Sequence, residues 1–148
     1  MTGVGAQRME SERHQVHVFP ARTSALTDIA ALATRVGARA GLSRNASLRL
    51  VLLVEELFTN TIAHGHGQDS DEPVRLDFDI TPGRVALTYE DTGPAHDPFA
   101  DVALPEAAAD VEKRPVGGLG VVLIAGMAQD VEYRRVEGRN RISLVISG

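Results

Sequence analysis

The sequence predicts an α+β fold, a two-layer α/β sandwich in which a mixed, mostly antiparallel sheet is covered on one face by three helices. Two observations predict this class. Pairs of segments alternate apolar and polar residues around turn signals, as hairpins do, and three other segments carry apolar residues at helical spacing. At 148 residues the chain is long enough for one domain with a buried core. We therefore expect a single domain over residues 15–148, preceded by a flexible polar arm at residues 1–14.

The first two expected elements are a strand and a helix. Residues 15–20 alternate apolar and polar and stop at a proline, which favours a strand at a sheet edge. Residues 24–40 place apolar side chains at helical spacing, with Thr23 or Ser24 as the N-cap. Gly41 is expected to end this helix.

A second helix follows, with Ser43 or Asn45 as its cap. The chain is expected to leave the helix at Gly65 and Gly67. The apolar residues expected to face the core from this helix are Leu48, Val51 and Leu52.

The remaining elements complete the sheet and its cover. Residues 74–80 and 85–91 alternate around a Thr-Pro-Gly-Arg turn, which predicts a β-hairpin. Residues 119–128 return to helical spacing, and residues 131–136 and 142–146 form a final hairpin around a glycine turn.

Composition excludes several classes of function. The net charge of −5 and the scattered arginines argue against direct nucleic-acid binding, so a protein partner or a small ligand is expected. The absence of cysteine excludes disulfides, thiolate nucleophiles and zinc-thiolate sites. The first 14 residues lack the apolar centre of a signal peptide, and the longest apolar run, residues 50–54, is far shorter than the ~20 needed to span a membrane. We expect a cytoplasmic protein without a membrane segment.

Glu56 and Asn60 form the first candidate site, on the second helix. Four helical residues turn through about 400°, so the two side chains project from nearly the same face, one turn apart. A carboxylate and a carboxamide stacked in this way can hold a magnesium ion beside a reacting hydroxyl group. The alternative is a solvated helix carboxylate, and Glu55 is an equal candidate for that role.

Asp91 and Gly93 form the second candidate site, at the end of a strand. Asp91 ends a row of buried positions, which is an expensive place for an unpaired carboxylate. The carboxylate can accept a hydrogen bond from an exocyclic amine such as that of adenine, with Gly93 leaving room for the ring. The alternative is an ordinary Asp-x-Gly turn.

The segment 117–120, Gly-Gly-Leu-Gly, forms the third candidate site because it leads directly into the expected helix. A helix onset exposes N–H groups and a positive dipole end that stabilise phosphate oxygens. The alternative is a flexible hinge. The segment matches neither the Walker pattern nor the dinucleotide fingerprint. The preceding residues, 94–116, show no clear period, and segments of that length in compact domains are usually functional.

His64, His66 and His96 raise the possibility of a metal-histidine centre. Histidines two positions apart at a helix end do not share a face, and no carboxylate stands at a recognised zinc spacing. No Gly-x-Ser-x-Gly or similar nucleophile arrangement is present, so hydrolytic serine catalysis is not supported.

The order E-x-x-x-N on a helix, D-x-G after a strand, a variable lid and a G-x-G helix start resembles the GHKL, or Bergerat, ATP-binding fold. The small size and the stretch GGLGVVLI…DVEYRRVEGRNRISLVI resemble the anti-sigma-factor serine/threonine kinases of the RsbW and SpoIIAB type. The resemblance covers residues 15–147, with the lid at about residues 94–117.

The resemblance implies a role for each matching residue. Asn60 matches the magnesium ligand, Glu56 the carboxylate that activates the attacking hydroxyl, Asp91 the adenine-binding aspartate, and Gly93 the glycine under the base. The segment matching the phosphate end of the lid is Gly117, Gly118, Leu119 and Gly120, and candidate γ-phosphate contacts are Lys113 and Arg114, from their charge and lid position. Asn140 falls near a polar position that assists adenine, and Ala95 stands where the family often has a second glycine.

The function implied by the resemblance is an ATP-dependent serine/threonine protein kinase that uses Mg²⁺ and phosphorylates a STAS-domain anti-sigma antagonist, with a sigma factor as the competing partner. A homodimer is expected from the resemblance only. The alternative is an ATP-binding switch that sequesters a sigma factor or another regulator without efficient kinase activity. Two features favour it: Ala95 in place of a family glycine, and lid cations that are assigned from charge and position only. A third possibility is an ATP-independent interaction module.

Overall fold

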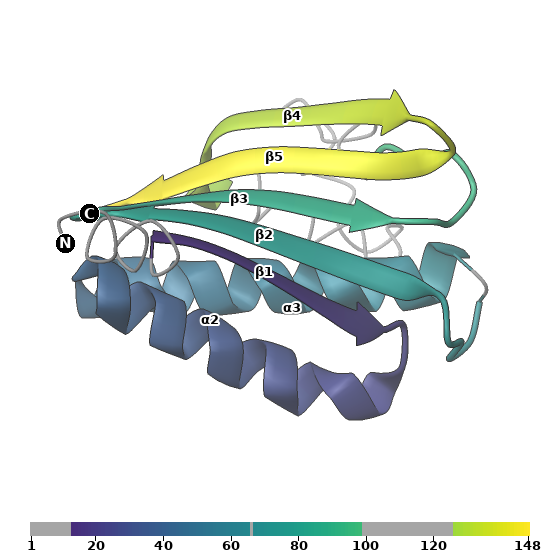
Figure 1. Ribbon diagram of the computed structural model, residues 1–148, viewed down its shortest axis with the longest axis horizontal. Coiled ribbons are helices and arrows are strands. Elements are labelled where there is room, and N and C mark those ends of the chain that lie inside the picture. The colour runs from purple at the N-terminus through teal and green to yellow at the C-terminus, as the bar shows by residue number, and fades with distance from the viewer. Residues whose placement is uncertain (1–12, 66, 99–125) are drawn as a thin grey trace, which may run out of the picture.

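The computed structural model describes residues 13–65, 67–98 and 126–148. Within these residues, two α-helices and a five-stranded sheet form two layers, with both helices on the same side of the sheet (Figure 1). The elements, in chain order, are β1 (His14–Pro20), the 3-10 turn η1 (Thr23–Ala25), α2 (Leu26–Ala40), α3 (Arg44–Gly65), β2 (Pro73–Thr81), β3 (Arg84–Asp91), β4 (Gln129–Val136) and β5 (Arg139–Ser147).

The strands lie in the order β1-β2-β3-β5-β4. This arrangement confirms the predicted α+β class, both hairpins and the edge position of β1, and every strand pairing in the described residues is antiparallel. The third helix predicted over residues 119–128 falls largely outside the described residues, as do most of the expected arm and lid.

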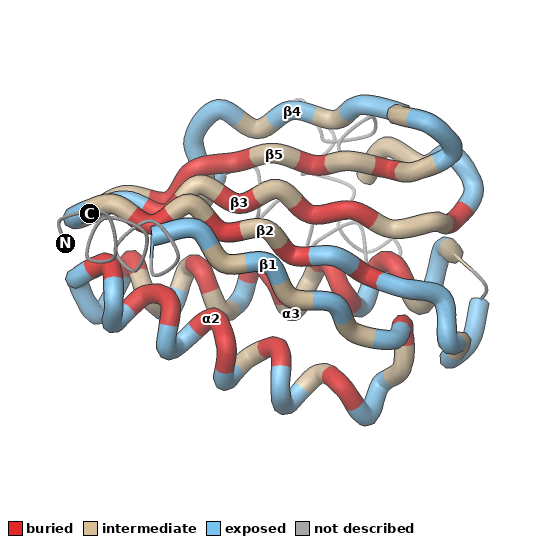
Figure 2. The backbone as a smooth tube through the Cα atoms, in the orientation of Figure 1, coloured by how far each residue is buried: buried red, intermediate tan, exposed pale blue. Residues whose placement is uncertain are grey.

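The core lies between the sheet and the helices (Figure 2). On β2, and on β3 as far as Tyr89, every second side chain is buried, which is the pattern of a sheet with one covered face. Phe58 of α3, Phe78 of β2 and Tyr89 of β3 are among the largest fully buried side chains. Burial of each large apolar side chain contributes about 1.5–3 kcal/mol, so this layer supplies most of the stability of the fold.

The predicted core face of α3 is wrong. Leu48 is 54% exposed and Leu52 is 47% exposed, and Val51 is only partly buried. The helix instead buries Ala46, Leu50, Leu53, Val54, Leu57, Phe58, Asn60 and Thr61. Residues 50–54 of the helix are all apolar, so two overlapping apolar faces fit the helical period. Only packing against α2 and the sheet selects one of them.

The predicted cap of the first helix is also wrong, whereas that of the second is confirmed. The N-cap of α2 is Ala25 and makes no side-chain cap, and Thr23 instead directs its N–H and hydroxyl to the carboxylate of Asp69, at 2.9 and 2.7 Å. At α3 the Ser43 hydroxyl accepts the Ala46 N–H at 3.1 Å. Gly41 ends α2 with a φ of 69°, as expected.

Gly37 marks the close approach of α2 to α3. A Cβ atom placed on Gly37 would lie 2.5 Å from Ser47 Oγ and 3.3 Å from Ser47 Cβ. We expect Gly37→Val to lower the free energy of unfolding by about 2–3 kcal/mol in urea titrations, because overpacking forces the helices apart. The control is Ala31→Val on the exposed side of α2, which introduces the same branched side chain into a helix and should cost less than about 0.5 kcal/mol. Equal losses in the two variants would contradict this packing.

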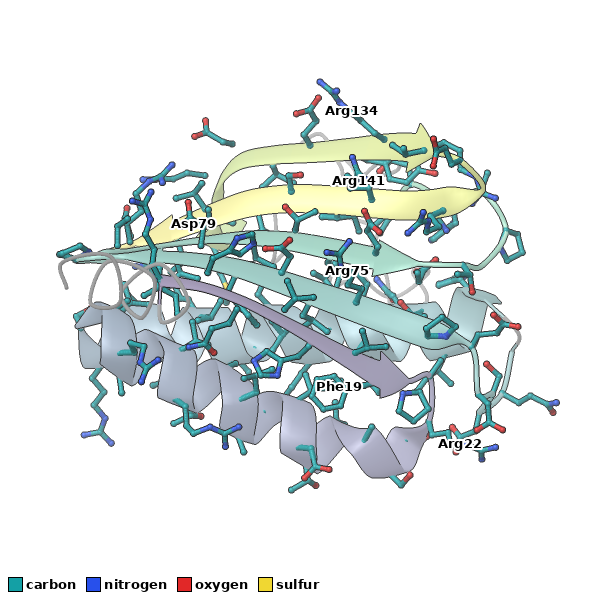
Figure 3. The ribbon with its side chains drawn as sticks, in the orientation of Figure 1. Phe19, Arg22, Arg75, Asp79, Arg134 and Arg141 are labelled. Carbon is teal, nitrogen blue, oxygen red and sulfur yellow. The ribbon has the colours of Figure 1, made fainter. Side chains whose placement is uncertain are left out.

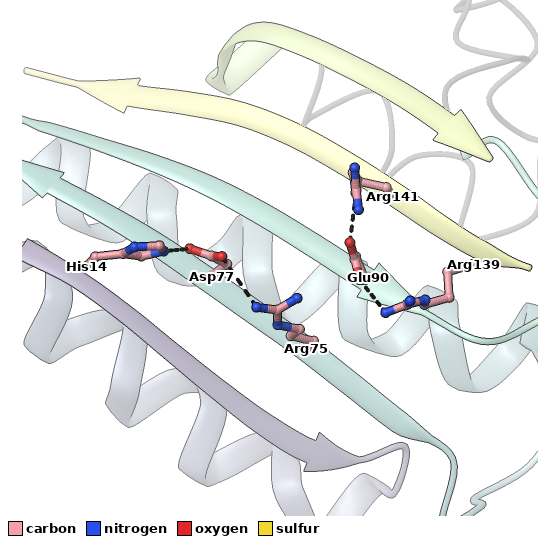
Figure 4. Close-up of polar contacts among 6 residues, drawn as sticks. All are labelled: His14, Arg75, Asp77, Glu90, Arg139 and Arg141. Atoms are coloured by element: carbon pink, nitrogen blue, oxygen red, sulfur yellow. Dashed lines mark hydrogen bonds and ion pairs between the residues drawn. The ribbon is translucent and has the colours of Figure 1, made fainter. Parts of the chain in front are cut away.

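The second face of the sheet carries polar side chains, among them Arg75, Arg134 and Arg141 (Figure 3). Glu90 on this face is only 4% exposed, because Arg141 Nε donates to one of its oxygens at 2.7 Å and Arg139 Nη1 to the other at 3.3 Å (Figure 4). The two ion pairs link β3 to β5 next to Asp91.

In the described residues, neither helix is both long and apolar enough to cross a membrane.

Candidate functional site

A pocket lies where the C-terminal end of α3 meets the end of β3 and the start of β5. Its apolar walls include Leu57 and Ile142. Its polar lining comes from three separate parts of the chain and includes Asn60, Thr61, His64, Asp91, His96 and Asn140. The structure therefore brings Asn60 and Asp91, two of the residues singled out by the sequence, into one pocket.

Asp91 ends β3 with its carboxylate on the helix side of the sheet. Thr61 Oγ1 lies 2.9 Å from Oδ2, and Oδ1 accepts from Asn140 Nδ2 at 2.8 Å and from the Gly93 N–H at 3.1 Å. An unpaired carboxylate at this buried position would be costly in free energy, and these hydrogen bonds offset that cost. A carboxylate offers about four acceptor positions, so Oδ2 can accept one further hydrogen bond from a ligand in the pocket.

Thr61 and Tyr89 belong to the site although sequence reasoning did not name them as site residues. The Tyr89 hydroxyl lies 2.6 Å from Thr61 Oγ1, and burial raises the pKa of Tyr89, so the phenol stays protonated and can donate. Thr61 Oγ1 also lies 3.1 Å from the Leu57 carbonyl oxygen, so its proton has two acceptors to choose from. The available signal was position: Thr61 follows Asn60 in the helix, and Tyr89 shares a strand face with Asp91.

Asn140 of β5 holds the loop that follows Asp91. Besides its bond to Asp91, Nδ2 donates to the Pro94 carbonyl at 2.9 Å. Its Oδ1 accepts from the Tyr133 hydroxyl at 2.6 Å and from the His96 N–H at 3.1 Å. The resemblance implies a polar residue that assists adenine, and in the structure the Asn140 side chain bonds to Asp91 and to the loop that follows it.

We expect Asn140→Ala to lower the free energy of unfolding by about 2–3 kcal/mol. Asn140 is 5% exposed, and its removal leaves several buried polar groups without their partner. Urea titration measures the loss, and faster amide hydrogen exchange at residues 93–97 locates it. Asn45→Ala, at an exposed asparagine in the first turn of α3, is the control and should change neither quantity. Unchanged exchange at residues 93–97 in Asn140→Ala would contradict the assigned role.

Gly93 is packed against the end of α3. A Cβ on Gly93 would lie 3.2 Å from Gly65 Cα, so the backbone of α3 occupies the space beside this glycine. Ala95 is exposed, and its φ is not positive, since the non-glycine residues with positive φ in the described parts are Asp130 and Glu137. The backbone of the loop therefore does not need a glycine at position 95.

Asn60 is 8% exposed and lines the pocket, and its Nδ2 has no hydrogen-bond partner within the residues that the structure describes. An unpaired buried amide costs about 1–3 kcal/mol, which a ligand in the pocket would offset. Rotation of the carboxamide by 180° exchanges its nitrogen and oxygen, so either atom can face that ligand. Glu56 lies one turn earlier on α3, is half-buried, and is not among the lining residues.

His64 and His96 meet at the pocket as a stacked pair, with ring centroids 4.3 Å apart and planes at 19°. The structure thus joins two of the three histidines considered for a metal centre, while His66 lies outside the described residues. Within the described part of the chain, no three metal-binding side chains form a group. The candidate residues that also lie outside the described residues are Lys113, Arg114, Gly117, Gly118, Leu119 and Gly120.

Comparison with known proteins points to one family. The sequence profile of the histidine kinase-like ATPase domain matches residues 19–146. The serine-protein kinase RsbW of Listeria innocua is 27% identical over 106 residues, which cover 70% of this chain and 68% of that protein. RsbW of Listeria monocytogenes serotype 4a matches with the same identity and coverage.

One solved structure covers nearly the whole fold. A chain in the crystal structure of the SiaB–SiaC complex from Pseudomonas aeruginosa superposes with a TM-score of 0.60, over 99% of this chain and 97% of that chain. Its sequence identity is 14%, so the likeness concerns the fold.

Proposed function

Because this chain belongs to the histidine kinase-like ATPase domain family, we propose that it binds ATP in the pocket beside Asp91 and transfers the γ-phosphoryl group to a serine or threonine hydroxyl of a partner protein. The observation that carries the proposal is the pocket itself, which combines the restrained carboxylate of Asp91 with the unpaired amide of Asn60.

Asp91 recognises the base. Its Oδ2 accepts a hydrogen bond from the exocyclic amine of adenine, while Thr61 and Asn140 keep the carboxylate in place. Leu57 and Ile142 supply apolar surface for the ring. Since a guanine ring carries a carbonyl where adenine carries the amine, the same carboxylate disfavours guanine.

Asn60 fits a magnesium ion because a carboxamide oxygen is a hard ligand and this amide lacks a partner among the described residues. Magnesium, when bound, neutralises charge on the phosphate oxygens. The amides of Gly118 and Gly120 and the side chains of Lys113 and Arg114 are proposed to hold those oxygens as well, in line with the resemblance.

Glu56 is the proposed general base, one turn from Asn60. The partner's hydroxyl oxygen bonds to the γ-phosphorus, the bond from phosphorus to the bridging oxygen of ADP breaks, and the hydroxyl proton passes to the Glu56 carboxylate. Phosphoryl transfer depends chiefly on positioning and charge neutralisation, so one well-placed carboxylate suffices for the proton.

The proposed partner is a STAS-domain anti-sigma antagonist, with a sigma factor as the competing partner. The support comes from the RsbW relatives, which are named serine-protein kinases, at 27% identity. A second function, an ATP-binding switch without efficient transfer, is favoured by one observation: Glu56 does not line the pocket.

Incubation with labelled Mg-ATP and a candidate STAS-domain partner tests the proposal. We expect label on a serine or threonine of the STAS protein. Saturable binding of Mg-ATP without label on the partner would favour the switch. No change in melting temperature with Mg-ADP would contradict both functions and favour an ATP-independent module.

A further inference from the structure

The two edges of the sheet are protected to different degrees. An edge strand presents unpaired backbone N–H and C=O groups, and proteins normally shield them with charges, bulges or short strands. The β4 edge is shielded in this way. Four of its residues are charged, namely Asp130, Glu132, Arg134 and Arg135, and its pairing with β5 is interrupted by a bulge between Gln129 and Glu132.

The β1 edge has little such protection. Its sequence, HQVHVFP, contains no Asp, Glu, Lys or Arg, and its pairing with β2 is regular over the whole strand. Val16 and Val18 are 45% and 60% exposed, on the sheet face away from the helices, because they pair with Asp77 and Arg75. Two exposed β-branched residues on a regular edge are a surface on which another strand can pack.

The helix side of β1 forms a basic groove. Helix α2 packs against β2 and β3, and a hollow beside β1 is lined by Gln15, Arg35, Val36, Ala38 and Arg39. Arg35 and Arg39 lie one turn apart, are exposed, and make no ion pair with any described residue. The pKa of His17, on the same side of β1, is lowered by burial and by the charge of Arg35.

We propose that the outer edge of β1, which pairs with no strand in the described residues, binds an extended segment of a partner protein as an added strand, and that the segment alternates apolar and acidic residues. Side chains alternate between the faces of a strand, so one set would lie beside Val16 and Val18 and the other over Arg35 and Arg39. Main-chain hydrogen bonds along β1 supply affinity, and the two faces supply specificity.

A second copy of this chain is the poorer occupant. Antiparallel pairing of two β1 strands would place the Arg35/Arg39 pair of each chain on the same side of a joint sheet, where like charges oppose one another. An acidic segment instead meets charges that lack partners among the described residues.

The groove is separate from the nucleotide pocket, so the inference does not depend on the proposed phosphoryl transfer. Gln15 pairs with Phe78, near the β2–β3 turn, whereas Asp91 pairs with Val74 at the other end of β2. Binding at β1 should therefore leave the affinity for Mg-ADP unchanged.

The test is a titration of the full chain, followed by amide NMR, with a synthetic peptide of about eight residues that alternates valine and glutamate. We expect shifts concentrated at residues 14–20 and an affinity that falls about tenfold or more in Arg35→Glu/Arg39→Glu. Arg134→Glu, on the opposite edge, is the matched control and should bind as the parent does. A peptide with lysine in place of glutamate should bind much more weakly. Thermal melting confirms that the variants are folded.

Three results would overturn the inference: no binding of the acidic peptide, equal binding of the lysine peptide, or shifts that map away from β1. A fourth is a dimer in sedimentation that dissociates in Val18→Lys, which would assign the edge to a second copy. Unchanged Mg-ADP affinity in the Arg35/Arg39 variant separates this test from that of the proposed function.

His17 provides an independent check on the groove. The Arg35 charge lowers the pKa of His17, so Arg35→Glu should raise it, as should the bound acidic peptide. The NMR titration of the His17 ring measures both changes. The groups to consider around the ring are Arg35 of α2 and the Gln15 side chain, whose Oε1 lies 3.3 Å from His17 Nε2. An unchanged pKa in Arg35→Glu would contradict the proximity of the two side chains.

Discussion

Asp91→Asn should lower the affinity for Mg-ADP at least about 100-fold while the protein stays folded. Two N–H groups, from Gly93 and Asn140, meet Oδ1 of Asp91, so the oxygen of an asparagine at this position must stay there. Its NH₂ group then replaces Oδ2. Thr61 can accept from this group by turning its own hydroxyl proton to the Leu57 carbonyl, 3.1 Å away.

The adenine amine has no such adjustment open to it, because it would face a donor where Asp91 offers an acceptor. Isothermal titration calorimetry with Mg-ADP measures the loss, and a thermal melt without nucleotide measures the effect on folding. The control is Asp79→Asn, since Asp79 is half-buried on the other face of the sheet and pairs with Arg13. Asp91→Asn protein that binds Mg-ADP as the parent does would remove the carboxylate from base recognition.

Glu56→Gln should lower the rate of phosphoryl transfer by about 10²–10⁴-fold and leave Mg-ADP binding within about twofold of the parent. Glutamine keeps the size and polarity of the side chain but cannot take the hydroxyl proton. Glu56 does not line the pocket, so the substitution leaves the contacts of Asn60 and Asp91 intact.

Glu55→Gln is the matched control, because Glu55 is the adjacent residue and, like Glu56, is half-buried. Transfer to the STAS partner under single-turnover conditions measures chemistry apart from product release. Loss of transfer in Glu56→Gln alone supports Glu56 as the base. Transfer at the parent rate in both variants would show that neither carboxylate takes the proton. Loss of transfer in Glu55→Gln alone would assign the role to Glu55.

Local sequence signals predicted the strands well and the helix faces less well. The first hairpin alternates apolar and polar residues, most regularly in β2, and a shift of one residue would turn every apolar side chain of β2 to the wrong face. In α3 the run from Leu50 to Val54 is apolar at each position, so the helical period alone left the buried face open. The capping residues of α2 were misplaced for a similar reason, since the hydroxyl of Thr23 has a distant partner, Asp69, that no local pattern reveals.

The sequence by itself determined the order of the elements, the positions of Asn60 and Asp91 within them, and the family, because each depends on short motifs and on their order along the chain. Only the tertiary structure decided which side chains restrain Asp91, since Thr61, Tyr89 and Asn140 come from three elements that meet solely through packing and strand register. It also decided which edge of the sheet is exposed and which arginines lie beside it. Those properties depend on the spatial neighbours of a residue, and hydrophobic burial and register bring these together from distant parts of the chain.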